Sequence, residues 1–353
     1  MNRQTKKNFR AVDFFCSAGG MTAGFRKAGI DVLGGIDIDP TCRETYTVNN
    51  PSSKFLLSDV RDLSFGTLET ELGVKTNDDE MIFICCSPCQ FWSKVNTDKT
   101  KSSKSKNLLL DFQRFVLHFM PAFIVVENVP GILRRPGNPL KDFLAFLTAN
   151  RYHFKHDIMN ASHFGVPQTR RRFLLIASRV TKHILFPVPD TKKSPPTVRQ
   201  TIGDCRIFPP IEAGHRDGTD FLHTASGLSE SNRKRLVLTK ADGGTRETWS
   251  KTDLQIPAYV GKDGFFEDVY GRMYWDKPAP TLTTKFHSVT NGRFAHPEQH
   301  RAISLREGAV LQTFDPNYKF VSNSLGGIAK LIGNAVPPQL SFRIARAIMN
   351  SDD

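Results

Sequence analysis

Cysteine is scarce in this chain of 353 residues, and its six copies are unevenly placed. Three of them, Cys85, Cys86 and Cys89, fall within five residues of one another, and the others are far apart. Small secreted domains held by disulfides carry many cysteines in short chains. We therefore exclude a disulfide framework and expect a protein of a reducing cytoplasm.

Long apolar runs are also missing. No run approaches the roughly 18 apolar residues that a membrane-spanning helix requires, so we expect no membrane segment. Residues 1–10 are polar and basic, and no apolar segment follows them, so we expect no secretory signal.

Acidic residues are outnumbered by basic ones. There are 35 Asp and Glu against 48 Lys and Arg, which gives a net charge of +13 and a pI near 9.5. This balance favours a polyanionic partner, with nucleic acid the first candidate. The length exceeds that of one typical domain, so we expect two lobes.

The first half of the chain alternates between predicted strands and helices. A strand at residues 11–15 leads into a turn of small residues, 16–20, that opens a helix. Small residues at a helix N-terminus let the backbone approach a ligand closely. A second strand, 32–36, ends in Asp37, where nucleotide-binding folds place an acid on ribose hydroxyls. The combination predicts a nucleotide-type ligand, and an ordinary βα turn is the alternative.

A cysteine motif follows the apolar run at residues 81–85, which predicts a buried strand. The motif, Cys86-Ser87-Pro88-Cys89, precedes a polar tract with five lysines between residues 94 and 106. A cysteine at a strand end, ahead of a basic loop, is placed to act as a nucleophile. The motif is also a C-x-x-C, so a thiol oxidoreductase is the alternative, although that motif normally opens a helix in a much shorter chain. Zinc binding is disfavoured because no second Cys or His pair has finger spacing.

An acidic residue ends the next apolar strand. Residues 123–126 are apolar and β-branched or aromatic, as in a buried parallel strand, and Glu127 and Asn128 follow directly. Ligands of open α/β sheets bind at this carboxyl edge. Desolvation there would raise the pKa of Glu127 so that it carries a proton at neutral pH. The alternative is that Glu127 caps the next helix.

Basic residues alternate before the last strand of this half, which we expect at residues 174–177. Gln168, Arg170 and Arg172 would project to one side of an extended segment, and Arg171 to the other. This pattern favours a phosphate or base-edge site, with a solvated basic cluster as the alternative.

The α/β alternation stops after residue 186. Proline, glycine and loop-forming residues dominate until about residue 280, which predicts a smaller second domain of irregular β and loop structure. We expect a catalytic domain at 1–186, a recognition domain at 187–318, and a segment at 319–353 that returns to the first domain.

These motifs, in this order, resemble the DNA cytosine-5 methyltransferase family of the bacterial restriction-modification type. The likeness covers nearly the whole chain. The segments that carry it are Asp13-Phe14-Phe15 with Gly19-Gly20, Pro88-Cys89-Gln90 with Ser93, Glu127-Asn128-Val129, Gln168 with Arg170 and Arg172, Arg306-Glu307 with Leu311-Gln312, and Gly333-Asn334-Ala335-Val336-Pro337-Pro338.

The resemblance implies a fold and a reaction. The fold is a Rossmann-like sheet that binds S-adenosylmethionine, with a target-recognition domain of irregular β and loop structure. The reaction transfers a methyl group to C5 of a cytosine flipped out of double-stranded DNA and leaves S-adenosylhomocysteine. Cys89 would add to C6, Glu127 would protonate N3, and Arg170 and Arg172 would polarise the O2 side.

The resemblance also implies two sets of binding residues, to which we add loop residues expected near DNA. Two departures from the family pattern stand in the donor site: Ser17 replaces a glycine, and Ile38 replaces an aromatic residue. The implied donor-binding residues are Phe15, Ala18, Gly19, Gly20, Asp37, Ile38, Asp59, Val60, Pro88, Leu108, Asn334 and Val336. The residues expected to bind DNA are Gln90, Ser93, Arg246, Arg272, Thr281, Thr284 and Lys285.

The expected partner is double-stranded DNA, with a cognate restriction endonuclease that acts separately, in the bacterial cytoplasm or nucleoid. We expect a monomer, no metal and no membrane association. One alternative is a tRNA cytosine-5 methyltransferase, whose Cys-Phe-Thr signature is not found, since Arg206 follows Cys205. Another is a catalytically silent DNA-binding regulator, against which the intact Cys89 and Glu127 argue.

Overall fold

The computed structural model of the chain describes residues 7–88, 107–134, 137–261 and 268–351. Chain contacts divide it into two compact units. Unit 1 comprises residues 1–160, 171–189 and 338–353, and unit 2 comprises residues 161–170 and 190–337.

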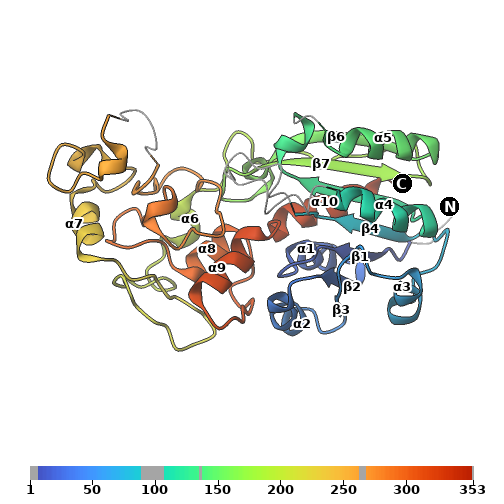
Figure 1. The fold of residues 1–353 in the computed structure, drawn as a ribbon, viewed down its shortest axis with the longest axis horizontal. Helices are drawn as coiled ribbons and strands as arrows, with labels where there is room; N and C mark the ends of the chain where they lie inside the picture. The colour runs from blue at the N-terminus through green and yellow to red at the C-terminus, as the bar shows by residue number, and fades with distance from the viewer. Residues whose placement is uncertain (1–6, 89–106, 135–136, 262–267, 352–353) are drawn as a thin grey trace, which may run out of the picture. The chain divides into compact units, whose positions relative to one another are not determined.

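Unit 1 is an α/β sandwich whose described strands form one sheet of seven, in the order β3-β2-β1-β4-β5-β7-β6 (Figure 1). The first five strands pair in parallel, and β7 is antiparallel to both of its neighbours. The strands are β1 (Arg10–Phe14), β2 (Asp31–Asp37), β3 (Lys54–Leu57), β4 (Met81–Cys85), β5 (Phe123–Asn128), β6 (His153–Asn160) and β7 (Arg171–Ser178).

Helices connect these strands, as crossovers between parallel strands require. Each strand predicted above is confirmed, with ends shifted by at most three residues. The helices of unit 1 are α1 (Gly20–Lys27), α2 (Arg43–Asn49), α3 (Phe65–Leu72), α4 (Leu108–Phe119), α5 (Leu140–Ala149) and α10 (Pro338–Asn350).

One large part of the core of unit 1 lies on the face of the sheet that α4 covers. Alternate residues of the strands, such as Phe14, Phe83 and Val126, pack against aromatic side chains of α4, including Phe112 and Phe115. Such alternation arises because successive strand residues point to opposite faces. The core therefore fixes the register of the central strands, and with it the positions of their carboxyl ends.

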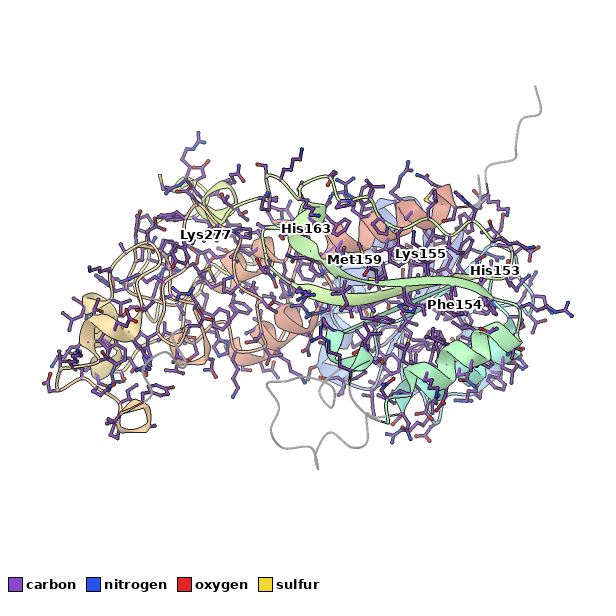
Figure 2. The ribbon with its side chains drawn as sticks, turned by 90° about the horizontal axis from the view of Figure 1, so that it is seen from above. His153, Phe154, Lys155, Met159, His163 and Lys277 are labelled. Atoms are coloured by element: carbon purple, nitrogen blue, oxygen red, sulfur yellow. The ribbon has the colours of Figure 1, made fainter. Side chains whose placement is uncertain are left out.

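One edge of the sheet is formed by β6, whose labelled residues are seen in Figure 2. His153 and Lys155 are exposed along it, and the Lys155 ammonium lies 5.5 Å from the ring centroid of Phe186. Charged side chains on an edge strand oppose unwanted pairing with another sheet. No helix in the described part of the chain is long and apolar enough to span a membrane.

The helices α1 and α10 are in close contact at Gly24. A methyl group at Gly24 would lie 2.3 Å from Ser341 Cβ and 2.5 Å from the Pro338 carbonyl oxygen. Backbone atoms cannot yield as a side chain can, so we expect Gly24→Ala to destabilise unit 1 by about 1–3 kcal/mol. Urea unfolding followed by far-UV circular dichroism measures this change.

The matched control is Gly66→Ala in α3, where the nearest atom to an added methyl group is 3.8 Å away. Alanine favours helix over glycine, so this variant should be unchanged or more stable by up to ~1 kcal/mol. Equal stability of the Gly24→Ala and wild-type chains would contradict the close packing of α1 on α10.

Unit 2 is built mainly from loops and short helices. The irregular structure expected here is confirmed, whereas β pairing among its described residues is confined to isolated bridges such as Gln168–Ala279 and Arg272–Ala295. Its α-helices are α6 (Val198–Ile202), α7 (Glu230–Leu238), α8 (Leu305–Leu311) and α9 (Leu325–Asn334).

The observed unit boundaries differ from those that we expected. Residues 161–170 belong to unit 2 because Thr169 N–H donates to the Ala279 carbonyl at 2.8 Å and Ala279 N–H to the Pro167 carbonyl at 2.9 Å. The return to unit 1 begins at residue 338 instead of 319, because Gln312 Nε2 in unit 2 donates to the Ile332 carbonyl at 2.8 Å.

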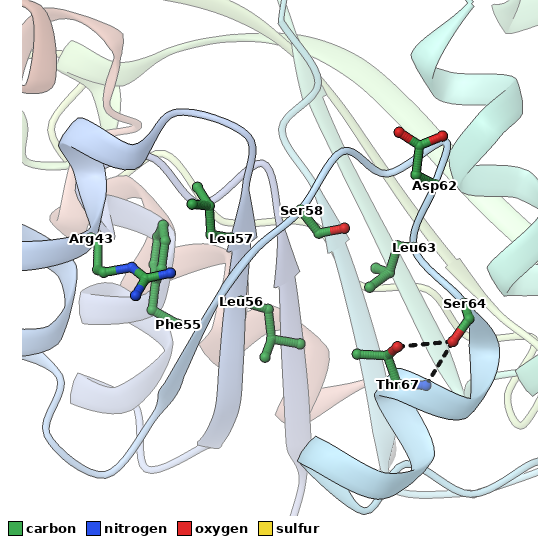
Figure 3. A pocket seen from close by; sticks show the side chains of 9 residues that line it. All are labelled: Arg43, Phe55, Leu56, Leu57, Ser58, Asp62, Leu63, Ser64 and Thr67. Atoms are coloured by element: carbon green, nitrogen blue, oxygen red, sulfur yellow. Dashed lines mark hydrogen bonds between the residues drawn. The ribbon is translucent and has the colours of Figure 1, made fainter.

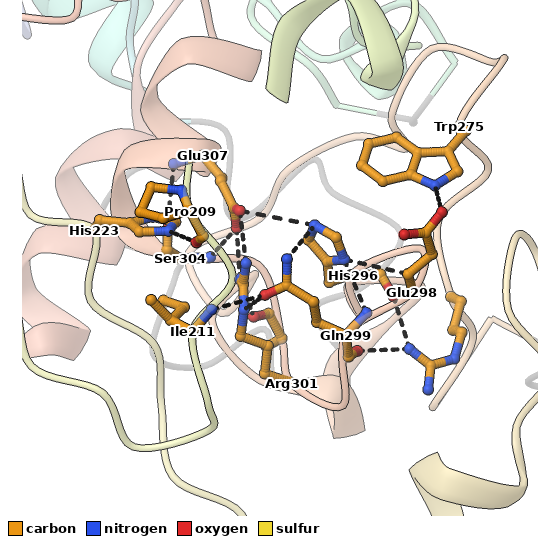
Figure 4. Close-up of polar contacts among 12 residues, drawn as sticks. Pro209, Ile211, His223, Trp275, His296, Glu298, Gln299, Arg301, Ser304 and Glu307 are labelled. Carbon is orange, nitrogen blue, oxygen red and sulfur yellow. Dashed lines mark hydrogen bonds and ion pairs between the residues drawn. The ribbon is translucent and has the colours of Figure 1, made fainter. Parts of the chain in front are cut away.

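A buried ionic network centres on α8 of unit 2 (Figure 4). Arg301 makes a bidentate contact with Glu307, at 2.7 and 2.8 Å, and neither side chain is exposed. Burial alone would raise the pKa of Glu307, but the hydrogen bonds and charge of Arg301 lower it to about 2. Burial lowers the pKa of the neighbouring His296 to about 4.

Both shifts make unit 2 sensitive to acid. His296 has a lower pKa in the folded state than its ordinary 6.5, so folding loses stability as pH falls from about 6.5 toward 4. Glu307 also has a lowered pKa, so its stabilisation is complete above about pH 4.5 and is lost as pH falls toward 2. Between pH 7 and 5 we therefore expect a loss of about 2 kcal/mol, mostly from His296.

Tryptophan emission can follow this loss, because Trp249 and Trp275 both lie in unit 2. The measurement is urea unfolding at pH 7 and pH 5 in a Trp92→Phe background. His296→Asn should reduce the difference between the two pH values, since an amide oxygen can replace the ring nitrogen that accepts from the Glu298 and Gln299 N–H groups. An unchanged pH dependence in this variant would contradict the assignment to His296.

Candidate active site

The centre of the sheet brings the predicted donor and cysteine motifs together. β1 lies between β2 and β4, and the chain leaves β1 and β4 at the same edge. Cys86 N–H donates to the Phe14 carbonyl at 3.3 Å, so the cysteine motif starts beside the end of β1. This is the switch point of the strand order, where open α/β sheets bind their ligands.

The turn after β1 has an unusual backbone. Phe15, Ser17 and Gly19 have positive φ angles of 64°, 48° and 84°. A bulky residue in this region is strained, and such strain clusters at ligand sites. Ser17, which stands where the family pattern has glycine, thus keeps a conformation that glycine favours.

Asp37 is held at the end of β2. Its carboxylate oxygens accept from the backbone N–H groups of Ser17 and Asp39, each at 2.9 Å. Burial raises the pKa of this carboxyl despite those hydrogen bonds. Ile38 beside it is an exposed apolar side chain, with 59% of its surface accessible. An acid with further acceptor capacity beside an exposed apolar surface suits a ribose and its base.

The start of α1 is fixed by a buried acid that the sequence motif contained but whose role we did not predict. Asp13 accepts from Thr22 Oγ1 at 2.7 Å, and Thr22 Oγ1 lies 3.1 Å from the Tyr46 hydroxyl. Burial raises the pKa of Asp13 to about 7. These contacts join β1, α1 and α2 beneath the turn. A Thr two positions inside the helix was the only sequence signal.

Two further donor-site residues lie in the loop after β3. Asp59 is bound by Arg61, whose Nε lies 3.0 and 3.1 Å from the two carboxylate oxygens, and these hydrogen bonds lower the pKa of Asp59. Val60 is buried.

The other donor-site predictions fall in several places. Ala18, Gly19 and Gly20 are buried in the turn, Leu108 is buried at the start of α4, and Pro88 is exposed. Asn334 and Val336 belong to unit 2, the first exposed and the second buried.

The catalytic acid candidate lies at the end of β5, next to an arginine of β7. The antiparallel register pairs Glu127 with Leu174 and so makes Arg172 its diagonal neighbour on the same face. Arg172 Nε lies 2.9 Å from Glu127 Oε1, and both side chains are largely buried. The sequence predicted the two residues separately, and the strand register explains why they meet.

A second contact ties this acid to the cysteine motif. Asn128 Nδ2 lies 3.2 Å from both the carbonyl oxygen and the hydroxyl of Ser87. These hydrogen bonds therefore join the segment that precedes Cys89 to the strand end that carries Glu127. The predicted nucleophile Cys89, with Gln90 and Ser93, lies outside the described residues.

Cys86 is poorly suited to redox chemistry. Burial raises the thiol pKa of both Cys85 and Cys86, and the neighbouring carboxylates add to the rise. Reactive thiols need a lowered pKa. This environment disfavours the thiol oxidoreductase alternative.

Gln168 and Arg170 lie in unit 2, where both form hydrogen bonds with the backbone of Leu282. Gln168 Oε1 accepts from Leu282 N–H at 2.9 Å, and Arg170 Nη1 donates to the Leu282 carbonyl at 3.0 Å. Arg170 Nη2 also donates to the Gly333 and Ala335 carbonyls, at 3.2 and 3.0 Å. These contacts favour a positioning role for Arg170, and its contact with a cytosine stays a prediction.

The residues expected near DNA divide by burial. Arg246 and Arg272 are buried, and Arg272 donates to four backbone carbonyls, those of Thr239, His296, Gln299 and Leu236. Burial lowers the pKa of Arg272 to about 10. Lys285 is exposed, and Thr281 and Thr284 are partly exposed. The geometry thus favours a structural role for Arg272 and keeps the other three as surface candidates.

The sheet order, the strained turn after β1 and the acid at the end of β2 define the class of Rossmann-like methyltransferases. Residues 9–350 match the family described as C-5 cytosine-specific DNA methylase. The chain therefore belongs to that family, whose methyl donor is S-adenosylmethionine and whose substrate is cytosine in DNA.

Individual relatives agree with this assignment. The chain is 35% identical over 342 residues to the type II methylase M.HgiDII of Herpetosiphon aurantiacus, covering 96% of this chain and 94% of that one. It is 29% identical to the type II methyltransferase M1.BsuMI of Bacillus subtilis (strain 168), over 97% and 80% of the two chains. A putative DNA modification methyltransferase encoded in an E. coli prophage has the same fold, with a TM-score of 0.72 at 21% identity, over 97% and 99% of the two chains.

Proposed function

We propose that this enzyme methylates C5 of a cytosine flipped out of a specific double-stranded DNA sequence, through a covalent bond between Cys89 and C6. The observation that supports the proposal is the Asn128–Ser87 contact, which joins the end of β5 to the segment that precedes Cys89. Inside a duplex both faces of the base are stacked, so flipping must precede the attack.

The proposed mechanism assigns the main steps to side chains of this protein. The Cys89 thiolate adds to C6, and Glu127 donates a proton to N3, which turns the ring into an enamine that is nucleophilic at C5. S-adenosylmethionine supplies the methyl group when bound. A base then removes the C5 proton, elimination of the thiolate restores the aromatic ring, and N3 returns its proton to Glu127. Arg172, in contact with Glu127, fixes the acid and stabilises charge on the O2 side.

The donor site would be formed by the residues described above. Asp37 would accept from the ribose hydroxyls, and Ile38 and Val60 would flank the adenine. Phe15 would lie against the adenine, and the turn at residues 18–20 would lie near the methionine part. Asn334 and Val336 stay predicted contacts of the donor.

We assign DNA recognition to unit 2 and to the residues that follow Cys89. Thr281, Thr284 and Lys285 are proposed to contact DNA, because hydroxyl and ammonium groups on loops suit phosphates and base edges. Gln90 and Ser93 would contribute from the loop after Cys89. We also propose that the enzyme acts as a monomer in the bacterial cytoplasm. The type II names of its relatives support a separate restriction endonuclease as its companion.

Expression in cells that lack cytosine methylation tests this function. Bisulfite sequencing should reveal protected cytosines at one recurring sequence. Methyl transfer to tRNA in place of duplex DNA, with the two offered in competition, would contradict the DNA specificity. Unmodified DNA beside a folded, donor-binding protein would support the silent regulator instead.

A further inference from the structure

Arg114 of α4 donates hydrogen bonds to the loop that carries two of the proposed donor-site residues, Asp59 and Val60. Its Nη2 lies 2.7 Å from the Val60 carbonyl oxygen and 3.4 Å from that of Arg61, and it also donates to the Leu63 carbonyl. Three carbonyls of one short loop thus converge on one guanidinium. An arginine that is only solvated would not order a loop in this way.

The guanidinium is itself held in place. Its central carbon lies 4.2 Å from the ring centroid of Phe115 and 5.3 Å from that of Phe65, so aromatic rings from α4 and α3 flank it. Such stacking restricts the arginine to few orientations. The hydrogen-bond donors are therefore preorganised toward the loop.

The loop has little other support on its outer side. A cavity of about 520 Å³ borders it, lined in part by Ser58, Asp62, Leu63 and Ser64 (Figure 3). The hydrogen bonds within the loop are local, from the Asp62 and Leu63 N–H groups to the Asp59 carbonyl. The hydrogen bonds from Arg114 fix the backbone of this loop to α4, while the side chains of Val60 and Leu63 are buried in the core.

α4 also begins with a donor-site residue. Leu108 is its first residue, and Arg114 lies six residues further on, which is about 9 Å along the helix. Arg114 therefore connects Val60 with the helix that begins at Leu108, and both residues belong to the proposed donor site.

From this geometry we infer that Arg114 is a positioning residue for the adenosine end of S-adenosylmethionine. It touches neither donor nor DNA; it fixes the Val60 backbone relative to α4. The inference rests on the proposed donor site.

The test is calorimetric titration with S-adenosylhomocysteine of the full chain and two variants, Arg114→Met and Arg114→Lys. Methionine keeps the aliphatic stem but loses every donor, so the Kd should rise about tenfold or more. Lysine can reach one carbonyl, so its Kd should lie between those of wild type and Arg114→Met. The KM for the donor should rise in the same order, while the Kd for duplex DNA stays within about twofold.

The matched control is Arg179→Met. Arg179 also donates to a backbone carbonyl of unit 1, that of Met120 at 2.6 Å, and pairs with Asp79 at 2.7 Å, but neither partner belongs to the donor site. This variant should keep its affinity for S-adenosylhomocysteine within about twofold, even if its thermal stability falls as much as that of Arg114→Met.

Two results would overturn the inference: an Arg114→Met chain that binds S-adenosylhomocysteine like wild type, or an Arg179→Met chain that loses as much affinity. If the wild-type chain did not bind the ligand at all, the proposed donor site itself would be wrong. The wild-type titration thus separates the two failures.

Discussion

Replacement of Cys89 by alanine should abolish methyl transfer, with a fall in kcat of at least about 1,000-fold. Without the thiolate, C5 of cytosine is not activated, and the proposed mechanism assigns the bond to C6 to no other group. Donor binding should persist, because the Cys89 side chain is not among the proposed donor contacts. The measurements are single-turnover transfer of labelled methyl groups to duplex DNA and calorimetric binding of S-adenosylhomocysteine.

The matched control is Cys86→Ala, which removes the neighbouring thiol. Cys86 is partly buried, desolvation raises its thiol pKa, and it has no step in the proposed mechanism, so activity should stay within a few-fold of wild type. A duplex with 5-fluorocytosine at the target should trap wild type and Cys86→Ala covalently, since fluorine cannot leave C5 as a proton does. Trapping of the Cys89→Ala chain, or equal loss of activity in the two variants, would contradict the assignment of the nucleophile.

Glu127→Gln should give the second largest effect, a fall in kcat of about 100- to 10,000-fold. Glutamine keeps the shape and a hydrogen bond but cannot transfer a proton to N3, and general acid catalysis supplies about this much. Arg172→Met should lower kcat less, because it removes the partner of the acid and leaves the acid itself. The measurement is kcat for methyl transfer at a saturating donor concentration.

A double-mutant cycle makes this prediction specific. Arg172 Nε and Glu127 Oε1 are in contact, so the double variant should lose less than the product of the two single losses. Arg171→Met is the control, because Arg171 is exposed on the same strand and plays no part in the mechanism. If the effects of Glu127 and Arg172 multiplied without coupling, the two residues would not act as one unit.

Most of the sheet could be predicted from the sequence because each strand is a short apolar run with a sharp end. The buried strands β4 and β5 show this best, since their apolar residues are followed at once by the polar groups of the site. Helix α4 was predictable because its apolar residues recur at helical spacing. Short local patterns of this kind need no knowledge of tertiary structure.

The contacts of the site were less predictable, because register and tertiary packing decide them. Nothing in the sequence says that Asn128 reaches Ser87 or that Arg114 collects the carbonyls of a loop 50 residues upstream. The burial of Arg272 could not be predicted for the same reason. From sequence alone, a basic residue on a loop predicts a DNA contact, and only the structure reveals the backbone carbonyls that Arg272 binds. Unit 2 has no repeating pattern, and its fold depends on side-chain to backbone bonds that no periodicity reveals.

The packing of α10 on α1 has a consequence for folding during synthesis. α1 precedes unit 2 in the chain and α10 follows it, and the two helices are in direct contact at Gly24. A nascent chain therefore cannot complete unit 1 until α10 has left the ribosome, after all of unit 2 has been made. A product truncated before residue 338 would contain the seven strands of the sheet and still lack the helix that packs on α1. Folding of unit 1 thus has to wait for the synthesis of unit 2.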